Sequence, residues 1–187
     1  MGKSKLKLDK GKLLLSEPFL HDPFFKRAVI LLTEHNVEGT VGFILNKPIN
    51  IKLHEAIEEF PEFNGNLYMG GPVQRDSLYY IHTMGNHIGQ SIEIMDGVFW
   101  GGNFETVKIM IQNGEVEESE LRFFMGYAGW GKQQLEQELS NNSWVVAQGN
   151  AQKVMKTDPE DLWQNIIKNY GKDYEMLSNF PEQPSMN

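Results

Sequence analysis

The segment from Glu120 to Ala128 restricts the possible folds more than any other part of the chain. Its residues alternate between two faces, and each face carries a phenylalanine, Phe123 on one and Phe124 on the other. A strand with one face in water carries polar residues on that face, so this pattern is typical of a strand covered on both sides. We therefore predict a central strand here, and other elements must cover it.

The rest of the sequence predicts strands and helices in irregular alternation. Strands are expected at residues 12–17, 28–34, 40–46, 66–69, 77–84, 91–95, 98–100 and 144–147. Helices are expected at residues 52–60, 104–113, from 132 onward, and 159–170. Asn36 and Gly39 supply a hairpin turn between the second and third strands. This order favours an α+β fold with a mixed sheet, as a single domain over residues 1–187.

The charge is unevenly distributed along the chain. The formal net charge is −8, but the first twelve residues carry five lysines and one aspartate, which leaves −12 for the remainder. An acidic body repels phosphate backbones, so specific binding of nucleic acid is not expected. We predict a flexible basic N-terminus over residues 1–11, and the alternative is a small contact with an anionic surface.

Composition excludes several further classes of site and location. The chain has no cysteine, so it has neither disulfides nor thiolate chemistry. No apolar run approaches the ~20 residues of a membrane helix, and no secretory signal is evident, so a cytoplasmic location without a membrane is expected.

Complete catalytic motifs are absent from the sequence. His54 and Glu58, one helical turn apart, are the nearest approach to a metal pair, but they lack a second histidine. We predict no catalytic residue, no metal site and no cofactor.

Two glycine-rich segments are the candidate binding regions. In the first, backbone N–H groups after Gly70 and the side chain of Arg75 could receive an anion, or the glycines could simply form a turn with Arg75 paired to a carboxylate. In the second, Gly126 to Gln134, a helix N-terminus could receive a phosphate, or the glycines could let Tyr127 and neighbouring rings pack closely. The predicted binding residues are Gly70, Gly71, Val73, Arg75, Tyr127, Gly129, Trp130 and Gln134.

Several ordered blocks make the chain resemble the YqgE/AlgH family of bacterial proteins over nearly its whole length. The blocks read DPFFKRAVILLTEHNVEGTVGFILNKP, GGPVQRDSLYYIH, DGVFWGGNFETVK and GYAGWGKQQLEQELSNNSW. The chain departs from the family at Gln133, where glycine is common. Without that glycine, close binding of a ligand by the backbone at this position is less expected. The resemblance implies a compact α+β fold with a bent, partly barrel-like sheet surrounded by helices. It also implies cytosolic members, some labelled transcriptional regulators, and it implies no catalytic residue or cofactor.

These observations leave three hypotheses for the function. The leading one is a non-enzymatic regulatory or binding protein whose partner, a small molecule or a protein, is unknown. The second is a transcriptional regulator that acts through DNA. The third is a hydrolase that uses carboxylates with Arg75 or a histidine.

Overall fold

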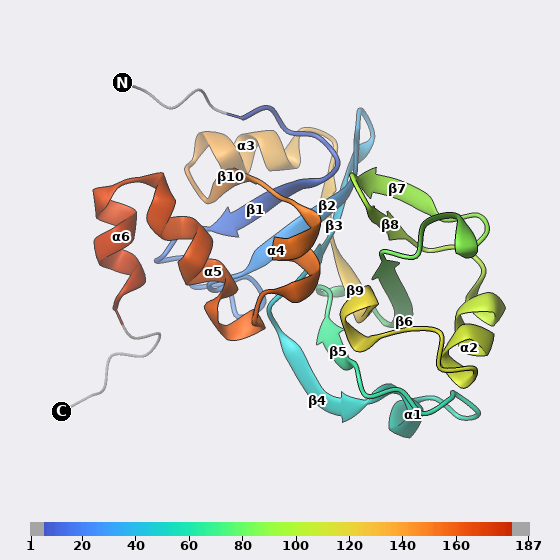
Figure 1. Ribbon diagram of the computed structural model, residues 1–187. Coiled ribbons are helices and arrows are strands. Elements are labelled where there is room, and N and C mark those ends of the chain that lie inside the picture. The colour runs from blue at the N-terminus through green and yellow to red at the C-terminus, as the bar shows by residue number, and fades with distance from the viewer. Residues whose placement is uncertain (1–5, 181–187) are drawn as a thin grey trace.

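The computed structural model describes residues 6–180, and over these residues it contains one sheet of ten strands together with six α-helices (Figure 1). The strands are β1 (Lys12–Ser16), β2 (Val29–Asn36), β3 (Gly39–Ile44), β4 (Pro48–Lys52), β5 (Asn66–Met69), β6 (Val73–His82), β7 (Ile92–Met95), β8 (Val98–Trp100), β9 (Leu121–Gly131) and β10 (Trp144–Gln148). The helices are α1 (Leu53–Ala56), α2 (Phe104–Gln112), α3 (Gln134–Ser140), α4 (Ala151–Lys156), α5 (Pro159–Ile167) and α6 (Lys172–Ser178).

The sheet is mixed and open. Its main path runs β10-β1-β2-β3-β9-β6-β8-β7, while β5 pairs with β9 and β4 pairs with β5. All pairs are antiparallel except β5 with β9, so the predicted α+β class with a mixed sheet is confirmed. Because β10 and β7 end the path without meeting, the sheet does not close into a barrel.

Strand β9 is the central strand that its two-faced sequence predicts. Its first half pairs with β5 on one edge and with β6 on the other, and the pairing with β6 extends to Tyr127. On the edge that β5 leaves, the second half pairs with β3, from Ala128 opposite Gly42 to Gly131 opposite Gly39. The change of partner occurs beside Gly126, whose φ of 69° lies in the left-handed region. One strand thus joins the two halves of the sheet.

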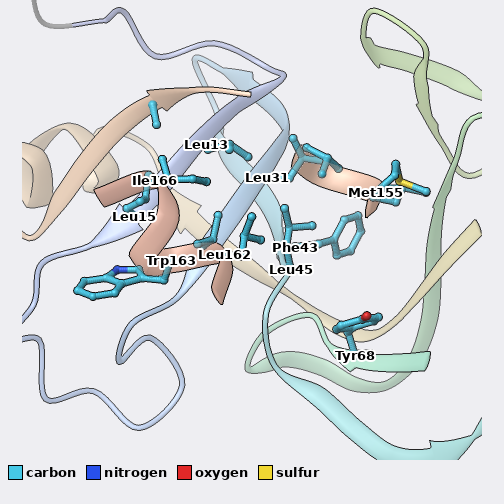
Figure 2. Packing of buried hydrophobic residues seen from close by; sticks show 14 of the residues in the cluster. Leu13, Leu15, Leu31, Phe43, Leu45, Tyr68, Met155, Leu162, Trp163 and Ile166 are labelled. Atoms are coloured by element: carbon cyan, nitrogen blue, oxygen red, sulfur yellow. The ribbon is translucent and has the colours of Figure 1, made fainter. Parts of the chain in front are cut away.

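Helices cover both faces of the half that contains β1, β2 and β3. On one face, Leu162 and Trp163 of α5 pack on Leu15 of β1, together with residues of β2, β3 and α4 (Figure 2). On the other face, Leu135 of α3 packs on Ile30 of β2 and its neighbours. In the second half of the sheet, α1 and α2 cover β5, β6 and the start of β9.

The predicted helix starts are confirmed where a side chain caps the backbone. The Asn103 side chain accepts from the N–H of Thr106 at 3.0 Å, and Asp158 accepts from the N–H of Glu160 at 2.9 Å. None of the helices within residues 6–180 is long and apolar enough to cross a membrane.

The helix predicted at residues 52–60 is wrong in extent. Lys52 ends β4, the helix covers only Leu53–Ala56, and Ile57 is already extended with φ of −124°. Phe60 follows Glu59, which has a left-handed conformation, and its side chain enters the core from a turn. The apolar residues thus have the spacing of a helix although the backbone is not helical. The sequence also missed β4, α4 and α6, which are short.

Parts of two terminal predictions lie outside the described residues. Of the basic segment 1–11, residues 6–11 are described, and Leu8 packs against the α3 side of the sheet. The last nine residues, NFPEQPSMN, contain two prolines, which predicts an extended tail, and most of this segment falls on residues 181–187, which are not described.

Candidate functional site

The two glycine-rich segments lie against each other in the structure. The N–H of Gly70 donates to the carbonyl of Met125 at 2.8 Å, and the N–H of Ile44 donates to the carbonyl of Gly70 at 2.9 Å. Three residues after Gly70, Val73 pairs with Tyr127 as β6 begins. Segments that are more than fifty positions apart in sequence therefore form one junction between β3, β6 and β9.

Glycine is required at this junction because two backbones approach closely. A Cβ on Gly70 would lie 2.2 Å from the carbonyl oxygen of Gly126, and a Cβ on Gly71 would lie 2.1 Å from the carbonyl carbon of Tyr127. A Cβ on Gly126 would lie 2.7 Å from the carbonyl oxygens of both Gly71 and Val73. The backbone of β9 fills the space over Gly70 and Gly71, so close packing accounts for these glycines.

Beyond the junction, the surface is hollowed between the β2–β3 hairpin and β9. We call this hollow the hairpin cavity; its volume is about 390 Å³. It is lined by Glu34, Asn36, Glu38, Gly39, Thr40, Val41, Val73, Tyr127, Gly129 and Trp130. Gly129 is exposed and carries no side chain, which leaves the half-buried ring of Tyr127 beside open space.

The lining is acidic. Glu34 and Glu38 are the charged side chains among the lining residues, and both are exposed. Asn36 orders this edge: its amide nitrogen donates to Glu34 at 2.6 Å, and its amide oxygen accepts from the N–H of Glu38 at 2.8 Å. The ring of Tyr127 meets Tyr79 edge-on at 5.7 Å between centroids. The cavity thus combines an aromatic surface with two carboxylates.

Of the predicted binding residues, four line the cavity: Val73, Tyr127, Gly129 and Trp130. The side chain of Trp130 is only 5% exposed and packs in the cluster under α3, where its indole N–H donates to Glu138 at 3.0 Å. Its contribution to binding would therefore be limited.

The remaining predicted residues lie outside the cavity lining. Gly70 and Gly71 lie in the junction beneath it. Arg75 lies over the ring of Phe24 at 5.6 Å, so within residues 6–180 it stacks on an aromatic ring rather than pairing with a carboxylate. Gln134 accepts from the N–H of Gly131 at 3.0 Å and donates to Glu138 at 3.1 Å, which makes it part of the α3 start.

The acidic residues of the hairpin were missed by sequence reasoning. The sequence predicted the turn at Asn36 and Gly39, but nothing local shows that this turn faces Tyr127. The contact depends on β3 pairing with the second half of β9, with Thr40 opposite Trp130, a contact distant in sequence.

Two buried ionisable side chains outside the cavity are held by the backbone. His82 bonds the carbonyl of Gly101 at 3.2 Å and the N–H of Met84 at 3.3 Å, and burial lowers its pKa. Arg122 donates to the carbonyls of Leu45 and Met155, and burial lowers its pKa also. Among residues 6–180, no group of three histidine, aspartate or glutamate side chains could hold a metal ion.

Comparison with known proteins gives a consistent result over the whole chain. A family model described as AlgH-like matches residues 13–175. A UPF0301 protein of Cytophaga hutchinsonii is 45% identical over 181 residues, covering 96% of this chain and 100% of that protein. A second one, from Chlorobaculum tepidum, is 45% identical over 180 residues, covering 96% of each chain.

Two solved structures share the fold. The solution structure of AlgH from Pseudomonas aeruginosa has a TM-score of 0.74 and 26% identity, and the match covers 98% of this chain and 100% of that one. The crystal structure of DIP2367 from Corynebacterium diphtheriae has a TM-score of 0.76, covers 95% of both chains and is 22% identical, which is a likeness of fold alone.

Proposed function

The chain belongs to the AlgH-like family, and from that premise we propose that it is a non-enzymatic regulatory or binding protein whose binding site is the hairpin cavity. The observation that carries the proposal is the half-buried Tyr127, which lines the same cavity as Glu34 and Glu38. An aromatic face and nearby carboxylates both attract cations. The proposed ligand is therefore a positively charged group, an amine or a guanidine, on a molecule small enough for about 390 Å³. A cytoplasmic setting remains our expectation.

The charge of the whole chain supports the same class of ligand. The net charge of −8 raises the local concentration of cations at the surface. Among the described residues that line the cavity, there is no lysine or arginine to compete for the two carboxylates. A cation would also replace the water that solvates Glu34 and Glu38 with a direct contact.

The experiment is a titration with agmatine and choline, followed by amide and aromatic chemical shifts of the full chain. We expect saturable shifts at Thr40, Tyr127 and Gly129. Removing the ring in Tyr127→Leu should weaken binding roughly fivefold, which corresponds to about 1 kcal/mol from a partly exposed cation–aromatic contact.

The controls separate the cavity from general attraction of cations. Glu38→Gln should weaken binding, while Glu62→Gln, which removes the same charge from an exposed position outside the lining, should not. If neither cation shifts the cavity resonances, or if both variants lose affinity equally, the proposal fails.

The two alternative functions have weaker support. Regulation through DNA is disfavoured because the acidic chain repels the phosphate backbone, and a gel-shift titration at low salt tests it directly. A hydrolase that uses Arg75 or a histidine meets two structural obstacles: Arg75 lies on Phe24, and both ring nitrogens of His82 are bonded to the backbone. Turnover of ester or phosphate substrates by the pure chain would revive that alternative.

A further inference from the structure

The sheet ends in an open strand at β10. This strand pairs with β1 and with no other strand among the described residues. Antiparallel pairs alternate, so every second residue of an edge strand turns its N–H and C=O away from its neighbour. The N–H of Glu17 donates to the carbonyl of Ser143, which sets the alternation: Val145 and Ala147 face β1, whereas Trp144 and Val146 face outward.

The outward groups of Trp144 and Val146 have no backbone partner within residues 6–180. The third outward residue, Gln148, is covered. Burial raises the pKa of Tyr170, and a hydrogen bond between its hydroxyl and the backbone of Gln148 offsets part of that rise. The edge therefore offers four hydrogen-bonding groups, from Trp144 and Val146.

This edge lies at the floor of an apolar groove, which we call the β10 groove. The groove has a volume of about 690 Å³ and is lined by Leu6, Leu139, Asn142, Trp144, Val145, Val146, Gln148, Lys153, Ile166, Asn169, Tyr170 and Tyr174. One wall comes from α3 and the other from α5, α6 and the turn between them, and these helices lie on either side of β10 in Figure 1. An added strand would place alternate side chains against the two walls.

Charge distinguishes among the possible occupants of the groove. Lys153 is the one charged side chain in the lining, it is exposed, and it has no ion pair within the described part of the chain. A second copy of this chain would present the same groove, whose described lining has no carboxylate. The chain's own first residues carry Lys3, Lys5 and Lys7, which add like charge.

We propose that the β10 groove binds an extended acidic segment of a partner protein by strand addition to Trp144 and Val146. The partner segment pairs its backbone with β10, packs apolar side chains against both walls, and places a carboxylate near Lys153. Exposed sheet edges bind peptides in this way, with affinity from the main chain and specificity from the side-chain pockets. This surface lies on the far side of β1, β2 and β3 from β9, so the inference does not depend on the hairpin cavity.

The test uses the full chain and two capped eight-residue peptides, in which valine alternates with glutamate or with lysine. Fluorescence anisotropy gives the affinities, and amide shifts locate the contact. We expect the glutamate peptide to bind at least tenfold more tightly than the lysine peptide and to shift the amides of Trp144 and Val146. Methylating the backbone nitrogens of the glutamate peptide should abolish binding.

Variants of the chain test the edge and the charge separately. Val146→Pro removes an N–H that β1 does not use, so the strand should persist while affinity falls about tenfold; Val146→Thr keeps the N–H and should bind normally. Lys153→Glu should reverse the preference between the two peptides, whereas Lys156→Glu, a neighbour outside the lining, should not.

Each other outcome overturns the proposal. A concentration-dependent dimer that Val146→Pro disrupts would assign the groove to a second copy. Absence of binding by the glutamate peptide, or binding that survives N-methylation, would exclude strand addition of an acidic segment.

Discussion

Gly126→Ala tests whether the close approach of two backbones, rather than left-handed geometry alone, requires glycine at the junction. Gly126 and Gly97 have nearly the same φ, 69° and 73°. A Cβ at Gly126 would lie 2.7 Å from two carbonyl oxygens, whereas a Cβ at Gly97 would have no heavy atom within 4 Å. Gly97→Ala is therefore a matched control for the backbone conformation.

The expected losses follow from these distances. Left-handed geometry costs a residue with a Cβ roughly 1–2 kcal/mol, and this is the whole expected loss in Gly97→Ala. In Gly126→Ala the strands must also part by several tenths of an ångström against backbone atoms of Gly71 and Val73. Overpacking of this kind adds about 1–3 kcal/mol. The total for Gly126→Ala is therefore roughly 2–5 kcal/mol.

Urea unfolding followed by tryptophan fluorescence gives the free energies of unfolding for the natural chain and both variants. We expect Gly126→Ala to lose at least 1 kcal/mol more than Gly97→Ala, about the lower bound of the overpacking cost. Equal losses, within about 0.5 kcal/mol, would show that φ alone selects glycine and would refute the packing argument.

Three further predictions concern buried polar groups. Glu138→Leu leaves the indole N–H groups of Trp130 and Trp144 without their shared acceptor, so we expect a loss of about 2–4 kcal/mol in urea unfolding and a shifted tryptophan emission; an unchanged midpoint would contradict it. Because burial lowers the pKa of His82, its neutral form stabilises the fold above the unfolded pKa of 6.5, and that stability is lost as pH falls through the folded pKa. Asparagine can keep one donor and one acceptor at this position but does not titrate. The free energy of unfolding of His82→Asn should therefore change less between pH 7 and the folded pKa than that of the natural chain. An equal slope in both chains would refute this prediction. Arg122→Met should cost about 2–4 kcal/mol, because the carbonyls that bond the buried guanidinium lose their donor, and thermal unfolding would show no change if those bonds are unimportant.

The sequence predicts elements well where the determining contacts are local. The two-faced pattern around Phe123 and Phe124 identifies the central strand, and Asn103 and Asp158 locate two helix starts through their own side chains. The residues at 52–60 show the limit of periodicity. Their apolar spacing fits a helix, yet the pairing of β4 with β5 holds Lys52 in a strand and ends the helix at Ala56.

The candidate site was predictable only in part, for the same reason. The glycines mark both segments of the junction, but their role depends on which backbone approaches them. The sequence left two alternatives at Gly70 and Gly71, an anion site or a simple turn, and the carbonyls of β9 occupy the space over both glycines. Glu34 and Glu38 lie beside Tyr127 because of the register in which β3 pairs with β9, and no local sequence pattern predicts that register.

The change of partner along β9 explains why the hairpin cavity exists at all. β5 and β6 both pair with Phe123 to Met125, so they lie on opposite edges of β9, and β3 takes the edge that β5 leaves. If β5 stayed on that edge along the whole of β9, β3 could not pair there and the acidic hairpin would not lie beside Gly129. The left-handed Gly126 lies between Met125, the last residue paired with β5, and Ala128, the first paired with β3. The cavity therefore depends on the same glycine contacts that close the junction. The β10 groove depends instead on the last strand of the other half of the sheet. A substitution at the junction should therefore disturb the hairpin cavity more than the β10 groove.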